Sequence, residues 1–246
     1  MGEASSEFEL ELRRIADGFF ERPGMPDYPL KALQEGNLPL ESLRRWYTED
    51  RHWERSYLFF NQCLLPTLLE KCPDEEGRAS LWSLIEFEFG AGRVEHAHPN
   101  YMRRFYMSIG VPEDQLPLSL DLSDALIRQE YDRLQAADFL ELLVGRFLAA
   151  ELVGPKVFAA YVDALKVHYG LTDEDVEFFT IHGNQDVSDA DVLFKMISRY
   201  ARTADKREMV RASLQKYFDR DRAKSYCALR PISFFWAPDP RPMLLS

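Results

Sequence analysis

Apolar residues recur at helical spacing through most of the chain, while the strict alternation of exposed strands and the Asn-Gly turns of hairpins are absent. This pattern predicts an all-helical protein. Helices are expected at residues 6–20, 40–72, 75–89, 99–109, 123–135, 136–168, 173–182, 188–202 and 205–222.

The whole chain, residues 1–246, is predicted to form one domain, because no linker or repeat divides it. Residues 1–38 contain an N-terminal helix followed by a proline-rich connection, and residues 111–123 form a second long connection. The tail, residues 228–246, is rich in proline and aromatic residues. We expect it to lie extended against the helices or against a second subunit.

Composition narrows the classes of partner. The formal net charge is -11 and the sequence pI is about 5.0, which argues against nucleic acid or an anionic membrane as a partner, since both attract basic surfaces. The N-terminus lacks the pattern of a secretion signal, and no apolar run reaches membrane length. We therefore expect a cytoplasmic protein that acts on a small molecule. The three cysteines are far apart, so neither a disulfide framework nor a thiolate zinc site is indicated.

Glu151 is the strongest physical signal in the sequence, because it interrupts the apolar face of a predicted central helix. At ~100° per residue it lies about 280° from Glu141, on the face that carries Phe147 and Phe158. The opposite, polar face is defined by Glu141, Arg146, Lys156 and Asp163. A buried carboxylate must be paired, protonated or bound to a metal. The alternative to a ligand is a structural Glu paired with an Arg or Tyr of another helix.

A second group follows Thr172, whose hydroxyl and the acids after it are typical of a helix start. His182, Asp186 and Asp189 are spaced by four and three residues, so a continuous helix would project all three from one side. Such nitrogen and oxygen donors suit iron or manganese. Alternatively, Gly183 ends one helix and Ser188 or Asp189 caps the next.

A third group combines Glu88, at the end of a predicted helix, with a glycine-containing stretch and with His96 and His98 before the next helix. A histidine at a helix start also acts as a cap or lies on the surface, and this alternative stays open. His52 and His168 have no carboxylate at ligand-like spacing, so both are interpreted as structural.

Taken in this order, the three groups resemble the haem-oxygenase-like dimetal oxidases, relatives of the thiaminase-like and pyrroloquinoline-quinone-synthase-like helical bundles. The resemblance runs from about residue 50 to 200. It rests on Glu88 and His98 ten residues apart, on Glu151 shortly before Pro155, and on a His-x3-Asp-x2 pattern after two phenylalanines. It implies a single-domain bundle of about seven core helices.

Carried over by position, the resemblance implies metal ligands at His98, Glu151, His182 and Asp186, with Glu88 able to join them; Glu88 and Glu151 are the candidate catalytic carboxylates. Position 189 departs from the family pattern, because it offers Asp where His is usual. That change makes the site more anionic and leaves open whether both irons are held. For the carboxylate of the first core helix, Glu54 is the nearest candidate, while Gln62 occupies the expected spacing.

The function that the resemblance implies is oxidation by two Fe(II) ions with dioxygen as co-substrate. We expect a small carboxylate substrate, foremost a free amino acid that is desaturated, cyclised, cleaved or N-oxygenated in natural-product biosynthesis. We also expect an external electron donor and assembly of the protein into a homodimer. Four arginines could bind the substrate carboxylate or simply face solvent: Arg93, Arg103, Arg104 and Arg199.

Three other functions compete with this one. A thiaminase-like hydrolase needs a reactive cysteine, and Cys63 lies in an apolar run that would raise its pKa. A cofactorless quinone-synthase-like oxidase would not need acids at positions 151, 186 and 189. A non-catalytic helical interaction protein would leave those acids solvated. Haem oxygenase is disfavoured, because no histidine precedes His52.

Overall fold

A computed structural model describes residues 2–21, 28–49 and 57–218, and all regular structure in these ranges is helical. The predicted all-α class is thus confirmed. The elements are α1 (Gly2–Phe20), α2 (Tyr28–Gln34), α3 (Leu40–Glu49), η2 (Phe60–Leu64), α4 (Leu65–Lys71), α5 (Glu75–Glu88), η3 (Val94–His96), α6 (His98–Ser108), η4 (Glu113–Gln115), α7 (Ala125–Ala136), α8 (Phe139–Leu142), η5 (Leu143–Leu148), α9 (Ala149–Tyr169), α10 (Glu177–Tyr200) and α11 (Ala204–Phe218).

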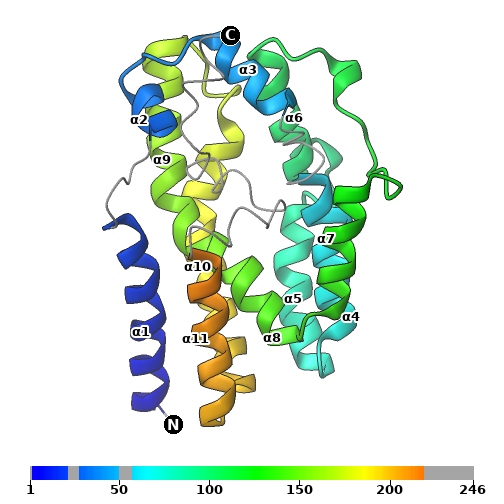
Figure 1. Cartoon of the computed structure of the whole chain (residues 1–246), viewed down its shortest axis with the longest axis vertical. Coiled ribbons are helices and arrows are strands. Elements are labelled where there is room, and N and C mark those ends of the chain that lie inside the picture. Colours follow the sequence, from blue (N-terminus) through cyan, green and yellow to red (C-terminus); the bar gives the residue numbers. More distant parts are fainter. Residues whose placement is uncertain (1, 22–27, 50–56, 219–246) are drawn as a thin grey trace.

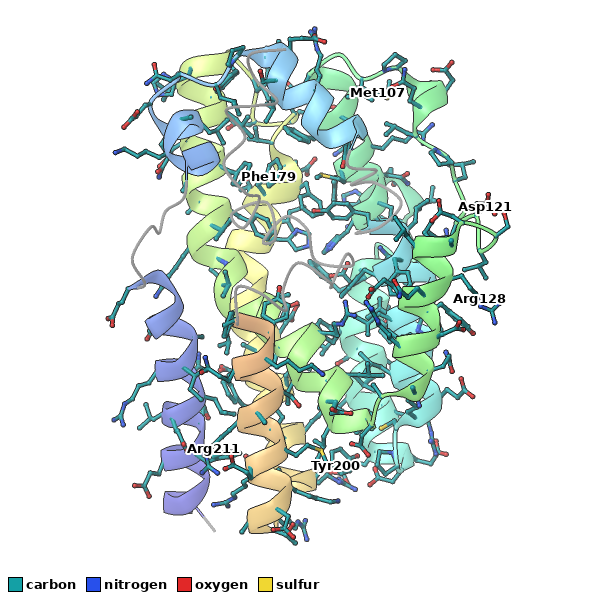
Figure 2. The ribbon with its side chains drawn as sticks, in the orientation of Figure 1. Met107, Asp121, Arg128, Phe179, Tyr200 and Arg211 are labelled. Carbon is teal, nitrogen blue, oxygen red and sulfur yellow. The ribbon has the colours of Figure 1, made fainter. Side chains whose placement is uncertain are left out.

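The helices α9 and α10 form an antiparallel pair at the centre of the bundle. Gly170 ends α9 in the left-handed conformation (φ 68°), which turns the chain back toward α10. In Figure 1, α1 and α11 lie beside one end of this pair, while α4, α5 and α7 lie on the other side of the molecule. Figure 2 shows Phe179 in the interior and Tyr200 near the lower end, so α10 runs through much of the bundle. None of the described helices combines the length and apolar character needed to cross a membrane.

The segment from Phe139 to Tyr169 is continuously helical, as predicted, but its turns are not uniform. Asp138 and Glu141 form a capping box that begins it, and residues 143–148 then form a π-helical turn. A π turn rotates each residue by less than an α turn does, so the calculated faces shift. Arg146, predicted on the polar face, is therefore buried, with 3% of its surface exposed.

The buried Arg146 is paired with a carboxylate that the sequence did not single out. Its guanidinium donates to Glu130 of α7 at 3.0 Å, and Glu130 also accepts a hydrogen bond from Arg133. Glu130 is as buried as Arg146. The ion pair thus fixes α7 against the π-helical turn from within the core.

One other helix prediction needs correction. The ranges 173–182 and 188–202 are one helix, α10, so Gly183 does not end it. The cap predicted at Thr172 does form, with Asp175, but it closes a turn ahead of α10. The helix predicted at 40–72 agrees with α3 and with helical residues 57–71, while residues 50–56 lie outside the described part of the chain. Helix α2 was not predicted. The tail at 228–246 lies outside the described residues.

We predict that Glu130→Gln lowers the free energy of unfolding by about 3–5 kcal/mol, because it removes the carboxylate that compensates a buried guanidinium. Urea unfolding measures this change. Asp132→Asn is the matched control on the same helix: Asp132 pairs with Arg128 on the surface, so its loss costs about 1 kcal/mol or less. Equal effects of the two changes would contradict this role of the Glu130–Arg146 pair.

Candidate metal centre

Three side chains from three elements converge in the interior. Glu88 is the last residue of α5, His98 is the first residue of α6, and His182 lies in the first half of α10. One ligand atom from each lies within 4.8 Å of the others. Glu88 and His98 are buried and His182 is half-buried. We call these three residues the donor cluster.

The turn between α5 and α6 brings Glu88 and His98 together. Gly90 adopts a left-handed conformation (φ 81°), and a Cβ atom there would lie 2.2 Å from the carbonyl oxygen of Arg93 and 2.6 Å from the nitrogen of Ala97. Only glycine fits such a close approach. The chain then passes through η3, and Pro99 stands in the first turn of α6. The ten-residue spacing between Glu88 and His98 thus corresponds to one tight connection between α5 and α6.

Within the cluster, Nδ1 of His98 lies 2.9 Å from Oε2 of Glu88, but the approach is not aligned as a hydrogen bond. The two atoms lie side by side, as two ligands of one ion would. Burial opposes the charged form of Glu88, but the neighbouring His98 outweighs it and lowers the pKa of this carboxylate. Burial likewise opposes the charged form of His98, and the charge of Glu88 reverses this and raises its pKa.

His182 is held ready to donate a lone pair. Its Nδ1 lies 2.7 Å from the carbonyl oxygen of Phe178; because that oxygen can only accept, Nδ1 carries the proton and Nε2 is left as a bare nitrogen. Burial, followed by repulsion from His98, lowers the pKa of His182 to about 4. The ring is therefore neutral near pH 7, which is the state that binds metals.

Aromatic rings surround the two histidines. The His182 ring lies 4.1 Å from Phe178 and 5.5 Å from Phe158 between centroids, and Phe87 contacts His98 edge-on at 5.0 Å. Tyr57 makes an edge-to-face contact with Phe178. These rings exclude water from the donors on the sides that they cover.

Glu151 and Asp189 lie on the same pair of helices, further from the turn that joins them. Glu151 precedes Phe158 by seven residues, and Asp189 follows His182 by seven. Because α9 and α10 are antiparallel, the two acids lie at one level, about 10 Å along the helix axes from His182. Glu151 is 7% exposed and Asp189 is 8% exposed, so the sequence correctly predicted that Glu151 is buried. Neither acid is part of the donor cluster.

The remaining predicted ligands divide by location. Glu54 lies outside the described residues, as does the side chain of Asp186, although its backbone is part of α10. The prediction for Gln62 needs correction. Its exposed side chain donates a hydrogen bond to the carbonyl of Leu118 and accepts one from the backbone N–H of Leu120, so it does not enter the interior. The buried amide is that of Asn61, one position earlier, which donates to the carbonyl of Tyr57. The π-helical turn at Phe60–Leu64 changes which residue faces inward, and a uniform spacing argument misses this.

Three of the four arginines predicted as possible substrate ligands form ion pairs or hydrogen bonds within the protein. Arg104 pairs with Glu177 and lies over the ring of Tyr101, while Arg199 pairs with Asp74 and Glu76. Arg103 holds the connection after α6. Arg93 is exposed.

The other two described histidines contact groups of the protein outside the donor cluster. His168 contacts the carbonyl of Gln34, and His96 contacts the hydroxyl of Tyr101. His52 lies outside the described residues.

The donor cluster fits a divalent transition metal. It offers two imidazole nitrogens and one carboxylate from a buried, largely apolar site, the donor types that iron accepts. Nδ1 of His98 is buried and has no hydrogen-bond partner among the described residues, which supports the same conclusion, because buried polar atoms almost always have a partner.

Comparison with known proteins agrees with this geometry. Residues 56–220 match the protein family described as "Iron-containing redox enzyme". A protein of Nitrosomonas europaea named 4-aminobenzoate synthase is 28% identical, over 76% of this chain and 78% of its own length. The crystal structure of a domain of unknown function with a haem oxygenase-like fold, from Shewanella denitrificans, matches with a TM-score of 0.64 at 16% identity, covering 98% of this chain and 94% of that one. The predicted haem-oxygenase-like fold is thereby confirmed.

Cys63, the candidate nucleophile of a thiaminase-like activity, is buried, and burial raises the pKa of its thiol to about 11. The thiol therefore stays protonated as the pH rises through the neutral range, and at pH 7.5 fewer than about one molecule in 1,000 carries the thiolate. We predict that iodoacetamide leaves Cys63 unmodified in the native protein and modifies it in urea, as measured by peptide mass spectrometry. Rapid native labelling at this position would revive the nucleophile hypothesis.

Proposed function

Because the chain belongs to the family of iron-containing redox enzymes, we propose that it is a non-haem iron oxidase or oxygenase that uses dioxygen to oxidise a small carboxylate. The observation that carries this proposal is the donor cluster: Glu88, His98 and His182 offer three ligand atoms within 4.8 Å in a buried site. In this proposal these three residues hold one iron ion.

We further propose a second iron ion, held by Glu151 and Asp189 with Asp186 as an additional ligand. The support is the burial of Glu151 and Asp189 and their shared level on the antiparallel helices α9 and α10. Asp189 also contributes to the raised pKa of His98, which means that its charge acts on the donor cluster. An all-oxygen ligand set would make this second position harder and more anionic than the first.

The residues of this chain have three tasks in the proposed reaction. The iron, when bound, supplies the redox chemistry with dioxygen. His182 is held by the Phe178 carbonyl in the tautomer that presents Nε2. The carboxylate of Glu88, beside His98, would balance part of the positive charge of the ion. The surrounding aromatic rings give the substrate a mostly apolar environment and keep water away.

We propose a free amino acid as the first substrate to test. The overall acidity of the chain argues against polyanionic substrates. The relative named 4-aminobenzoate synthase is itself named for a small carboxylate, and its coverage of three quarters of this chain favours formation of 4-aminobenzoate as the second candidate.

The first test is iron binding. Glu88→Gln keeps the size of the side chain but removes its charge, so we predict that anaerobic Fe(II) titration shows affinity weakened at least about tenfold. Glu86→Gln, an exposed change two residues away on α5, is the control and should bind like the unmodified protein. Equal binding by all three proteins would exclude this donor cluster as the iron site.

The second test counts the ions. If two are held, Glu151→Gln combined with Asp189→Asn should reduce tightly bound iron from two equivalents to one, measured by elemental analysis after anaerobic desalting. Asp163→Asn, at an exposed position of α9, should leave two. One equivalent in the unmodified protein would refute the second ion while keeping the first.

The third test identifies the reaction. The iron-loaded protein, with ascorbate as external electron donor, is given oxygen and each amino acid in turn, and oxygen uptake and products are followed by mass spectrometry. Substrate-dependent uptake supports amino acid oxidation. Without an added amino acid, the ring and nitrogen of 4-aminobenzoate can come only from side chains of the protein itself. Its release together with a matching loss of mass from the protein therefore favours the second candidate. Absence of oxygen uptake in both cases contradicts both candidates.

A further inference from the structure

Asn61 carries a buried acceptor atom that nothing in the described part of the chain satisfies. The residue is 4% exposed, and its Oδ1 atom has no hydrogen-bond partner there. Its Nδ2 donates to the carbonyl oxygen of Tyr57 at 2.9 Å. Because that oxygen can only accept, the nitrogen must face it and Oδ1 points elsewhere. Buried polar atoms almost always have a partner, so this oxygen indicates a molecule that binds beside it.

The π-helical turn at Phe60–Leu64 directs this amide into the interior. Gln62, the next residue, is exposed. Asn61 is buried and lies four residues after Tyr57, so these two side chains lie on one side of the helix. The hydrogen bond to the Tyr57 carbonyl, one turn back, holds the amide in a single orientation. A fixed acceptor of this kind is suited to recognising a donor.

Asn61 lies on the side of its helix that faces the metal centre. The ring of Tyr57, one turn earlier on that side, contacts the ring of Phe178 at 5.0 Å between centroids. Phe178 in turn contacts the ring of His182 at 4.1 Å between centroids. Two ring contacts thus connect this side of the helix to a member of the donor cluster.

A second contact shows that this helix runs along the proposed ligands. Phe60, the residue before the acceptor, contacts Phe147 at 5.6 Å between centroids. Phe147 precedes Glu151 by four residues on the same continuous helix, and Phe178 likewise precedes His182 by four. Because α9 and α10 are antiparallel, both Glu151 and His182 lie between the two ring contacts along the helix pair. The acceptor therefore lies beside the stretch of α9 and α10 that holds the proposed ligands.

The chemistry of this acceptor selects the group that it can bind. An amide oxygen accepts hydrogen bonds, so it pairs with an N–H or O–H group and cannot pair with a carboxylate oxygen. A free amino acid, the first substrate proposed above, carries both a carboxylate and a charged amino group. Only its amino group can donate to Asn61, and hydrogen bonds from a charged donor are stronger than those between neutral groups.

We propose that Oδ1 of Asn61 binds the amino group of the substrate and makes the site selective for small amino carboxylates over carboxylates without nitrogen. This inference rests on the proposed function. Asn61 orients the amino end of the substrate, while the aromatic rings around the donor cluster contact its apolar part. Because Nδ2 is already bonded to the Tyr57 carbonyl, the acceptor is in place before the substrate arrives.

The test measures binding to the full-length, Fe(II)-loaded protein by calorimetry without oxygen, so that no turnover occurs. The probes are the standard amino acids, one at a time, and for each that binds, the desamino analogue, which is the carboxylate with the same carbon skeleton and no amino group. In the unmodified protein we expect the amino acid to bind at least about tenfold more tightly than its desamino analogue.

Two variants separate the acceptor of Asn61 from its structural hydrogen bond. Asn61→Leu and Asn61→Asp both lose the donor to the Tyr57 carbonyl, but only Asn61→Leu loses the acceptor. We expect the preference for the amino acid over its desamino analogue to fall at least about tenfold in Asn61→Leu and to be kept in Asn61→Asp. Gln62→Leu, which removes an exposed amide one position later, is the control and should keep the preference.

The proposal is overturned if no amino acid binds, if the desamino analogue binds as tightly, if Asn61→Leu keeps the preference or if Asn61→Asp loses it. Fe(II) affinity that falls at least about tenfold in Asn61→Leu would also overturn it, because the oxygen would then be a ligand of the metal. If Fe(II) binds and no amino acid does, this inference alone fails. Failure of the proposed iron site is seen instead as Fe(II) binding that Glu88→Gln does not weaken.

Discussion

The antiparallel packing of α9 against α10 is the constraint on which the rest of the structure depends. It sets Phe158 against His182 and brings the acids at 151 and 189 to one level, although they are 38 positions apart in the sequence. The donors on α5 and α6 then need only one short turn to reach His182. That turn requires glycine at position 90, where a side chain would collide with the backbone.

The core contains charged groups, and the fold handles them in two ways. Glu130 is neutralised by Arg146 and Arg133, so its burial serves to join α7 to the π-helical turn. Glu88 instead lies against two histidines, one of which is kept neutral by burial. A carboxylate among imidazole nitrogens is an arrangement that an ion can complete, whereas a carboxylate between two guanidinium groups is already complete.

The two π-helical turns link these features. Each inserts a wider turn into a core helix. At Phe60–Leu64 it turns Asn61 inward and Gln62 outward, and at Leu143–Leu148 it accompanies the burial of Arg146. Such turns are often found at functional sites. Here Tyr57, which precedes the first turn, packs against Phe178 beside the metal centre. The second turn carries Arg146, which pairs with Glu130 of α7.

The sequence by itself determined the helical class, the long central helix and the burial of Glu151, because helical periodicity acts over a few turns. Glu88, His98 and His182 were expected as ligands from the family resemblance. Tertiary structure alone decided which donors meet, since Glu88 and His182 are brought together by packing between distant helices. It also decided that Arg146 is buried and Gln62 is not, because a single π turn changes the register of a face without leaving a clear pattern in the residues.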